Sequence, residues 1–465
     1  MLLKPCLIYI IGASSLLMLI VGISLVLSNA FPNFLQSKVK TEVVLRNGTE
    51  AFEVWVDPPA PIYMQFYFFN LTNPAEVMSG ERPAVTEIGP YTYREYRPME
   101  DVVFQENGTR VASVNPKTYI FERNMSRGPE SDLIRTVNIP AMTVMERFKD
   151  NALATLISAY MRSTGIGLFT THTVGELLWG YEDSLLKALK MFYPELDDFF
   201  GLFYKTNASN DGEYTFFTGQ QNYQDFARVD TWNGKSSLDW WTSDECNMIN
   251  GTNGASFHPI ISKNEVLHMF SSDLCRSLYA IYTNDVTVKN IPGYRFVPPF
   301  EVFANMTVNP ANAGFCVPSG NCLGSGLLNV SMCKQGAPII MSSPHFYQAD
   351  EKFVQDVFGM RPNKDEHQTA IDINPLTGII LQAAKRVQIN VYVEKILSVT
   401  YHSLDSVLID DASAKKLQSV NIQKNVVENI PFLVIALGII LGGIFMLLMC
   451  RQTSTEAERQ PLISS

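Results

Sequence analysis

Histidine and cysteine, the usual protein ligands of transition metals, are scarce in this sequence, with 6 and 7 copies in 465 residues. No two cysteines have the C-x-x-C spacing and the histidines show no ligand spacing, which argues against zinc. The sequence also lacks a G-x-S-x-G motif, a P-loop, an H-E-x-x-H motif and a G-x-G-x-x-G motif after a strand. We therefore expect no catalytic residues, no cofactor and no metal, and we interpret the chain as a non-enzyme.

Basic residues are the minority among the charged residues. There are 36 lysines and arginines against 46 aspartates and glutamates, which gives a formal net charge of −10. An acidic chain is poorly suited to nucleic acid or to an anionic lipid surface, so we expect no nucleic acid among its partners. Proline- or serine-rich linkers, low-complexity runs and internal repeats are also missing, which favours one elaborated domain over several.

Charge is absent from two apolar stretches, residues 7–27 and 431–450. Each has about 20 residues, enough for a helix across a hydrocarbon core of roughly 30 Å. Because backbone groups in lipid must be satisfied within the segment, both are predicted to be transmembrane helices. A cleaved signal peptide is the alternative for the first stretch, because residues 28–30 resemble a cleavage site. The uncharged run is, however, longer than the roughly 7–15 apolar residues of a signal peptide.

N-glycosylation sequons are confined to the region between these stretches, which places residues 28–430 in the secretory lumen. The tails, residues 1–6 and 451–465, are then cytosolic. Five of the seven cysteines share the luminal region, where disulfides form, and the odd number leaves one thiol over. Cys6 and Cys450, at the membrane ends, are candidates for palmitoylation. The predicted acceptors are Asn47, Asn70, Asn107, Asn124, Asn207, Asn250, Asn305 and Asn329.

Most of the luminal region has the pattern of short β-strands. Residues 387–393 alternate apolar and polar side chains, and residues 64–71, 119–121 and 214–217 are rich in aromatics. Gly, Pro and Asn separate such runs at short intervals. This pattern predicts an antiparallel barrel or sandwich within an α+β membrane protein.

Residues 142–192 depart from the strand pattern. Apolar residues recur there at helical spacing, and residues 173–176 have the form of a capping box. We predict two or three amphipathic helices inserted into the β domain. Such helices usually bury their apolar stripe in their own protein, but a compact insertion can also offer an outward face to a partner.

The C-terminal tail carries a candidate sorting signal. Glu458 stands four residues before the pair Leu462–Ile463, which is the acidic dileucine pattern bound by clathrin adaptor complexes. An extended peptide of this kind places two apolar side chains in pockets and its carboxylate on a basic patch. Pro461 disfavours a helix before the pair, in keeping with an extended bound form.

Several longer segments resemble the class B scavenger receptor family over essentially the whole luminal region. Residues 44–52 and the dileucine tail are most similar to a lysosomal member of that family. The segments that carry the wider resemblance are residues 89–95, 132–136, 246–252, 315–333, 372–378 and 384–386.

The resemblance implies an antiparallel β-barrel with a helical bundle at its membrane-distal apex and an internal tunnel for lipid. It also implies disulfides between Cys275 and Cys333 and between Cys316 and Cys322, with Cys246 free. After Val393 the chain is shorter than other members, so a late strand of the barrel is expected to be missing.

The resemblance further implies a receptor that binds β-glucocerebrosidase in the early secretory pathway and releases it in acidic lysosomes. The apical helices would make the contact, and Asn151 stands where the lysosomal member has a histidine. An unperturbed histidine has a pKa of about 6.5, so His172 is the candidate pH switch, a purely structural role being the alternative. The predicted cargo-binding residues are Asn151, Leu156, Ile157, Tyr160 and His172.

The alternative function that the resemblance implies is binding and transfer of cholesterol or phospholipid through the tunnel. The two functions are compatible with each other and with a homodimer. In either case the predicted location is the lysosomal membrane, reached through the endoplasmic reticulum and endosomes.

Overall fold

The computed structural model describes residues 5–150, 152–318, 320–334, 336–393 and 396–457 of the chain. The chain divides into two compact units. One consists of Met1–Glu42 with Ala414–Ser465, and the other, the large unit, is Val43–Ser413.

The smaller unit contains α1 (Pro5–Leu27), α2 (Ala30–Glu42) and α12 (Asp411–Ala457), the last of which begins in the large unit. Both α1 and α12 are long and apolar enough to cross a membrane. Ser15 Oγ donates to the carbonyl oxygen of Gly438 at 2.7 Å, and a Cβ on Gly438 would meet Leu19 at 3.0 Å. Small residues therefore let these helices pack closely, as is common between helices in lipid.

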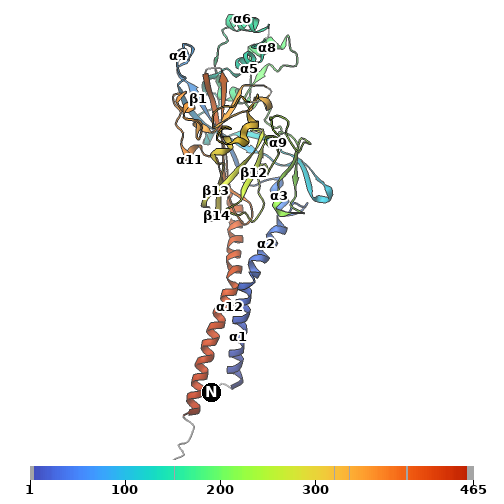
Figure 1. The fold of residues 1–465 in the computed structure, drawn as a ribbon, viewed down its shortest axis with the longest axis vertical. Coiled ribbons are helices and arrows are strands. Elements are labelled where there is room, and N and C mark those ends of the chain that lie inside the picture. The colour runs from blue at the N-terminus through green and yellow to red at the C-terminus, as the bar shows by residue number, and fades with distance from the viewer. Residues whose placement is uncertain (1–4, 151, 319, 335, 394–395, 458–465) are drawn as a thin grey trace, which may run out of the picture. The chain divides into compact units, whose positions relative to one another are not determined.

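A main sheet of eleven strands organises the large unit (Figure 1). Its order is β12-β13-β14-β17-β18-β19-β1-β2-β5, and β16 pairs with both β15 and β18. Every pairing is antiparallel, as the strand pattern predicted. The strands are β1 (Ile62–Leu71), β2 (Val85–Tyr96), β5 (Thr118–Phe121), β12 (Val266–Ser271), β13 (Arg276–Val288), β14 (Ile291–Val297), β15 (Leu327–Asn329), β16 (Ile339–Ser342), β17 (Ala370–Ile373), β18 (Ile380–Val393) and β19 (Ile396–Leu408).

The expected closed barrel is wrong, because no pairing among the described residues joins β12 to β5. Loops cover the two edges instead. Backbone bonds of Thr252 with His268 and Phe270, at 3.1 and 2.7 Å, occupy the outer edge of β12. On the other side, Lys117, just before β5, pairs with Ser209. These contacts supply partners to part of each edge without closure.

The expected loss of a late strand is also wrong. β18 and β19 form a long antiparallel hairpin that runs from Gln382–Leu408 to Val393–Ile396. β19 then pairs with β1, which joins the C-terminal hairpin to the first strand of the sheet. A strand is therefore present after Val393.

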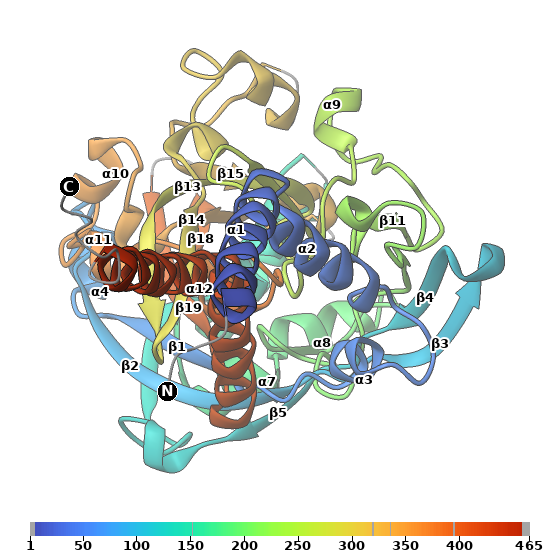
Figure 2. The same ribbon diagram turned by 90° about the horizontal axis from the view of Figure 1, so that it is seen from below.

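Smaller sheets and short helices surround the main sheet. Figure 2 shows the β3–β4 hairpin and β11 on the side of the large unit away from α10 and α11. The remaining strands are β3 (Glu100–Gln105), β4 (Arg110–Val114), β10 (Tyr214–Phe217) and β11 (Val229–Trp232) in one sheet, with the pairs β6 (Leu133–Val137) and β7 (Phe169–Thr173), and β8 (Tyr181–Glu182) and β9 (Phe199–Phe200). The helices are α3 (Glu50–Val56), α4 (Pro74–Met78), α5 (Ile139–Phe148), α6 (Ala154–Thr164), α7 (Val174–Trp179), α8 (Ser184–Lys190), α9 (Asp244–Asn247), α10 (Glu351–Gln355) and α11 (Lys364–His367). The 3-10 turns are η1 (Glu106–Gly108), η2 (Arg123–Met125), η3 (Tyr223–Asp225), η4 (Phe300–Phe303), η5 (Pro310–Phe315), η6 (Ser331–Cys333) and η7 (Pro344–Phe346).

An aromatic core lies between β1, β2 and α7. Phe66 and Phe68 of β1 and Tyr91 and Tyr93 of β2 are essentially inaccessible to solvent. The Tyr93 hydroxyl donates to Glu130 at 2.6 Å and accepts from the indole of Trp179 at 3.3 Å. The aromatic-rich run in β1 is therefore buried in the interior, with its polar atoms paired.

Candidate functional site

Helices α5, α6 and α8 form the insertion predicted over residues 142–192, and Figure 1 shows them gathered at one end of the large unit. They pack against one another through buried apolar side chains, among them Val144, Ile157 and Leu185. Ile157 is only 7% exposed, so it stabilises the insertion and is not available to a partner. The insertion thus has a core of its own, as the helical spacing indicated.

Large apolar side chains remain on the outside of this insertion. Leu156 on α6 is 67% exposed, and Met191 and Phe192, directly after α8, are 77% and 76% exposed. Met191 and Phe192 were missed from the sequence, because the helical spacing assigned residues up to 192 to a helix that in fact ends at Lys190. We call these three residues the outer apolar face.

The other predicted cargo-binding residues differ in their placement. The Tyr160 hydroxyl donates to the carbonyl oxygen of Ser184 at 3.4 Å, which links α6 to α8. Asn151 lies outside the described residues. Of the five predicted residues, Leu156 is therefore the one that the structure shows as strongly exposed.

His172 lies on β7, immediately before α7. The predicted capping box is confirmed: Thr173 Oγ1 accepts from the Glu176 amide at 3.1 Å, and the Glu176 carboxylate accepts from the Thr173 amide at 2.9 Å. The same carboxylate lies 3.6 Å from His172 Nδ1, and the imidazole stacks on Tyr181 at 3.7 Å between ring centres. His172 is therefore fixed at the start of α7, and its recorded partners do not include α6.

Two opposing effects act on the pKa of His172. Burial lowers it, whereas the carboxylates of Glu176 and Asp183 raise it, and burial prevails. The charged form is therefore reached only below the ordinary histidine range, at more acidic pH.

A second titratable cluster lies inside the large unit. Glu87 of β2 contacts two imidazoles through separate oxygens, at 2.9 Å from His345 Nε2 of η7 and 2.9 Å from His402 Nε2 of β19. His367 of α11 stacks on His345 with ring centres 4.5 Å apart, and Tyr67 of β1 stacks on His402 at 4.7 Å. All three imidazoles are buried. The histidines thus do form a cluster, from positions too far apart in sequence for any ligand motif.

Glu87, His345 and His402 place one ligand atom each within 4.8 Å of one another, a spacing that could suit a metal ion. The tautomer of His345 opposes this. Its Nδ1 accepts from the Arg361 backbone amide at 3.0 Å, so the neutral ring carries its proton on Nε2 and donates to Glu87. A metal would need the Nε2 lone pair. The arrangement therefore fits proton sharing better than metal binding.

The pKa values of this cluster follow from its geometry. Burial would raise the pKa of Glu87, but the hydrogen bonds from His345 and His402 outweigh burial and hold that pKa far below its usual range. Burial lowers the pKa of His402, and burial with the neighbouring imidazoles lowers the pKa of His367 to about 4. At neutral pH the centre of the cluster is thus an ionised Glu87 carboxylate that accepts hydrogen bonds from His345 and His402.

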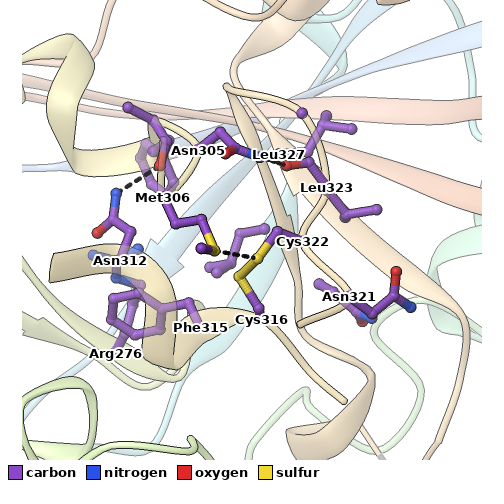
Figure 3. Close-up of a pocket in the computed structure, with 15 residues that line it drawn as sticks. Arg276, Asn305, Met306, Asn312, Phe315, Cys316, Asn321, Cys322, Leu323 and Leu327 are labelled. Atoms are coloured by element: carbon purple, nitrogen blue, oxygen red, sulfur yellow. Dashed lines mark hydrogen bonds between the residues drawn. A yellow bond between two sulfur atoms is a disulfide. The ribbon is translucent and has the colours of Figure 1, made fainter. Parts of the chain in front are cut away.

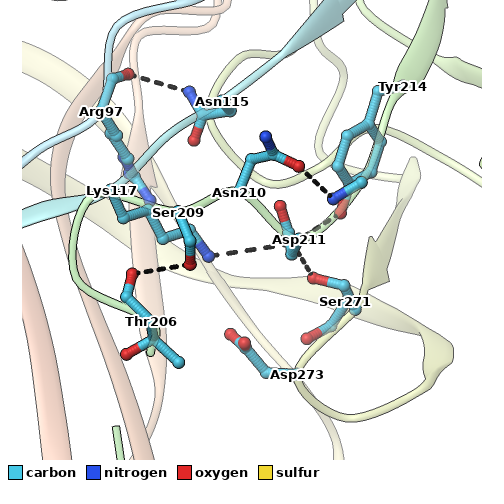
Figure 4. Close-up of polar contacts among 12 residues, drawn as sticks. Arg97, Asn115, Lys117, Thr206, Ser209, Asn210, Asp211, Tyr214, Ser271 and Asp273 are labelled. Carbon is cyan, nitrogen blue, oxygen red and sulfur yellow. Dashed lines mark hydrogen bonds and ion pairs between the residues drawn. The ribbon is translucent and has the colours of Figure 1, made fainter. Parts of the chain in front are cut away.

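Figure 4 shows part of an ionic network in the large unit. Lys117 lies 3.8 Å from Asp211, which also accepts from the Tyr214 hydroxyl at 3.0 Å. Lys385 of β18 contacts Asp273 at 2.5 Å and Asp405 of β19 at 3.8 Å. Burial raises the pKa of Asp405 to about 6, against the opposing effect of Lys385. The charges are largely paired, so this network joins the smaller sheets to the main one and holds no free nucleophile.

The described part of the chain contains two disulfides. Cys275 is bonded to Cys333 and Cys316 to Cys322, the pairs that the resemblance implies. Cys246 is free, and only 3% of it is exposed. Figure 3 shows the Cys316–Cys322 bridge in the wall of a cavity.

The eight predicted glycosylation acceptors differ in accessibility. Asn47, Asn107, Asn124 and Asn207 are exposed, whereas the other four are half-buried. At Asn305 the amide nitrogen that a glycan would modify donates to the Leu323 carbonyl at 2.5 Å. Glycosylation at these sites stays a prediction.

The sorting-signal residues Glu458, Leu462 and Ile463 lie outside the described residues.

A model of the CD36 family matches residues 13–449, nearly the whole chain. The chain belongs to the CD36 family. Among similar CD36-family proteins, Lysosome membrane protein 2 of Rattus norvegicus is 50% identical over 98% of this chain and 99% of its own length. The human protein of that name is 49% identical over the same shares. Scavenger receptor class B member 1 of Cricetulus griseus is 37% identical over 83% of this chain and 75% of its own length.

These relatives confirm the resemblance to class B scavenger receptors. The CD36-family match spans both terminal apolar helices and the large unit together.

Proposed function

We propose that this protein is a lysosomal membrane receptor that binds β-glucocerebrosidase in the secretory pathway and carries it to lysosomes. The chain is 50% identical to Lysosome membrane protein 2 of Rattus norvegicus over 98% of its length, and this similarity supports a location in the lysosomal membrane. The two apolar terminal helices support a two-pass membrane protein, whose termini we propose are cytosolic. Its large unit would then be luminal and glycosylated.

The outer apolar face is the observation that carries the receptor function. Leu156, Met191 and Phe192 each expose more than two thirds of their area on an insertion that already has a buried core. Exposed apolar side chains without a role in their own fold are typical of protein-binding surfaces. We propose that this face receives the enzyme.

Release in acid would use His172. Its imidazole is neutral at the pH of the endoplasmic reticulum and acquires charge only as pH falls below about 6.5, because burial lowers its pKa. The new charge would strengthen the pairing with Glu176 and disturb the stacking on Tyr181, at the start of α7. We propose that this change weakens the outer apolar face as a binding surface.

The decisive experiment captures β-glucocerebrosidase on the purified full-length protein at pH 7 and at pH 5. Binding at pH 7 that weakens at least tenfold at pH 5 supports the receptor function. The His172→Gln variant should bind at pH 7 and lose most of that pH dependence. His268→Gln is the matched control, because burial also lowers the pKa of His268 but it lies on β12. An unchanged pH dependence in His172→Gln would assign His172 a structural role only.

Lipid transfer is the second candidate function. The support for this candidate is membership of the CD36 family. A photoreactive sterol should label the purified protein on peptides from β18 or β19, and the absence of labelling there would contradict this candidate.

A further inference from the structure

Arg276, the first residue of β13, is a buried cation without a carboxylate partner. It is 5% exposed, and its recorded hydrogen bond runs from Nε to the Ser277 carbonyl at 3.2 Å. Other half-buried arginines pair with acids: Arg110 with Asp230 at 2.8 Å and Arg295 with Asp372 at 2.7 Å. No ion pair of Arg276 is found in the described part of the chain. A buried charge in this position requires compensation.

Two aromatic rings lie against the guanidinium of Arg276. The Phe315 ring lies 3.6 Å from the guanidinium carbon, and the Phe303 ring lies at 5.5 Å. Cation–π contacts of this kind stabilise the positive charge but accept no hydrogen bond in the way that an oxygen or an anion does. The guanidinium N–H groups therefore still need acceptors.

A cavity of about 40 Å³ lies beside Arg276 (Figure 3). Its wall includes the Cys316–Cys322 disulfide, Phe303 and Phe315, and no aspartate or glutamate is among its described lining residues. Two lining amides already donate elsewhere: Asn312 Nδ2 to the Ala304 carbonyl at 2.7 Å and Asn305 Nδ2 to the Leu323 carbonyl at 2.5 Å. The positive charge of Arg276 therefore dominates this cavity.

The free thiol of Cys246 does not supply the missing negative charge. Its Sγ donates to the Ala311 carbonyl at 3.5 Å, which requires the protonated thiol. Burial lowers the pKa of Arg276 to about 9. The guanidinium is thus left charged at neutral pH in an apolar setting without a counter-charge from the chain.

We propose that Arg276 and this cavity bind a small monovalent inorganic anion of the chloride class. A single water needs roughly 10–15 Å³ of such space, so this cavity has room for one such ion beside Arg276. The ion would accept hydrogen bonds from the in-plane N–H groups and neutralise the buried charge. It would thereby tie β13 to the loop closed by the Cys316–Cys322 disulfide.

Chloride dependence of unfolding tests the site. The full-length protein in detergent is heated in sodium chloride or in sodium gluconate at one fixed ionic strength. Chloride should raise the unfolding midpoint of the wild type in a saturable way, by about 2 °C or more. Arg276→Met should remove that dependence. The control Arg110→Met breaks another arginine contact and should keep the full chloride response.

Chloride-35 NMR gives a readout that does not depend on stability. The wild-type protein should broaden the chloride line in a manner competed by bromide, and Cys246→Ser should do the same. Arg276→Met should lose the broadening. If Arg276→Met does not fold, crystals of the wild type soaked in bromide should show an anomalous peak beside Arg276. Equal chloride responses in wild type and Arg276→Met, or bromide bound only elsewhere, would overturn the proposal.

Discussion

Glu87 and His402 lie 2.9 Å apart, carboxylate oxygen to Nε2, although 315 residues separate them in the chain. The contact joins β2 to β19, and a second one at 2.9 Å joins Glu87 to His345 of η7. One carboxylate thus holds three distant segments together. The titratable side chains around Glu87 determine how the stability of the large unit changes as pH falls.

The first prediction is that the large unit loses stability as pH falls from about 6.5 to 4. His367 and His402 have lowered pKa values, so the unfolded chain binds more protons over this range and the free energy of unfolding decreases. Glu87 has a depressed pKa, so its contribution is full above its ordinary value of about 4.3 and is lost below it. Urea unfolding of the full-length protein at several pH values measures this.

The Glu87→Gln variant sharpens this prediction. Loss of the charged acceptor between two imidazoles should cost about 2 kcal/mol at pH 7. It should also steepen the loss of stability between about pH 6.5 and 4, because Glu87 raises the pKa values of His367 and His402. Glu245→Gln, at an exposed residue of α9, is the control and should change neither. A Glu87→Gln variant as stable as the wild type at pH 7 would show that the hydrogen bonds contribute little.

The second prediction concerns the outer apolar face. The double change Met191→Ser, Phe192→Ser should lower the affinity for β-glucocerebrosidase at pH 7 by tenfold or more. Because both side chains are largely exposed, the unfolding midpoint should hardly change. Leu185→Ala offers the contrast: Leu185 is 1% exposed, so its truncation should cost about 2–5 kcal/mol of stability. Surface plasmon resonance and thermal unfolding separate the two effects.

The third prediction concerns the tail. The double change Leu462→Ala, Ile463→Ala should move the protein from lysosomes to the cell surface, because two apolar side chains are removed from the adaptor-binding peptide. Surface biotinylation measures the shift. Ser464→Ala, Ser465→Ala is the control and should keep the wild-type distribution. Continued lysosomal residence of the dileucine variant would assign sorting to another segment.

The fourth prediction concerns a buried amide. Asn390 of β18 is inaccessible to solvent, donates to Ile340 O and Ser342 Oγ at 3.1 Å each, and accepts from Gln388 Nε2 at 2.8 Å. Asn390→Leu should destabilise the fold by about 2–3 kcal/mol, since it leaves buried partners unsatisfied. Ile389→Val, on the neighbouring half-buried position, should cost about 1 kcal/mol. Thermal unfolding of both variants distinguishes the hydrogen bonds from packing.

Local patterns in the sequence predicted individual helices and strands well. The uncharged runs near both ends became α1 and most of the apolar part of α12, because length and composition alone define such helices. The spacing of Thr173 and Glu176 became a true capping box, since both hydrogen bonds form within one helical turn. The aromatic run of β1 became a buried strand.

The edges of the main sheet could not be predicted from the sequence. The strand pattern fits a barrel, a sandwich or an open sheet equally, because each strand has the same period. The loop at Thr252 and the pairing of Lys117 with Ser209 supply partners to the edge strands and leave the sheet open. Such pairings join segments that share no local signal.

The sequence by itself determined that this is a CD36-family chain with two apolar terminal helices and an antiparallel, helix-bearing unit between them. Only the tertiary structure decided which face of β18 is buried: Gln388 and Asn390 are inside, while Val387 and Ile389 are half-exposed. It also decided that Glu87 meets His345 and His402, and that Arg276 faces a cavity without an acid. The physical reason is that burial and charge pairing depend on long-range neighbours, whereas helix and strand periods are set by the local chain.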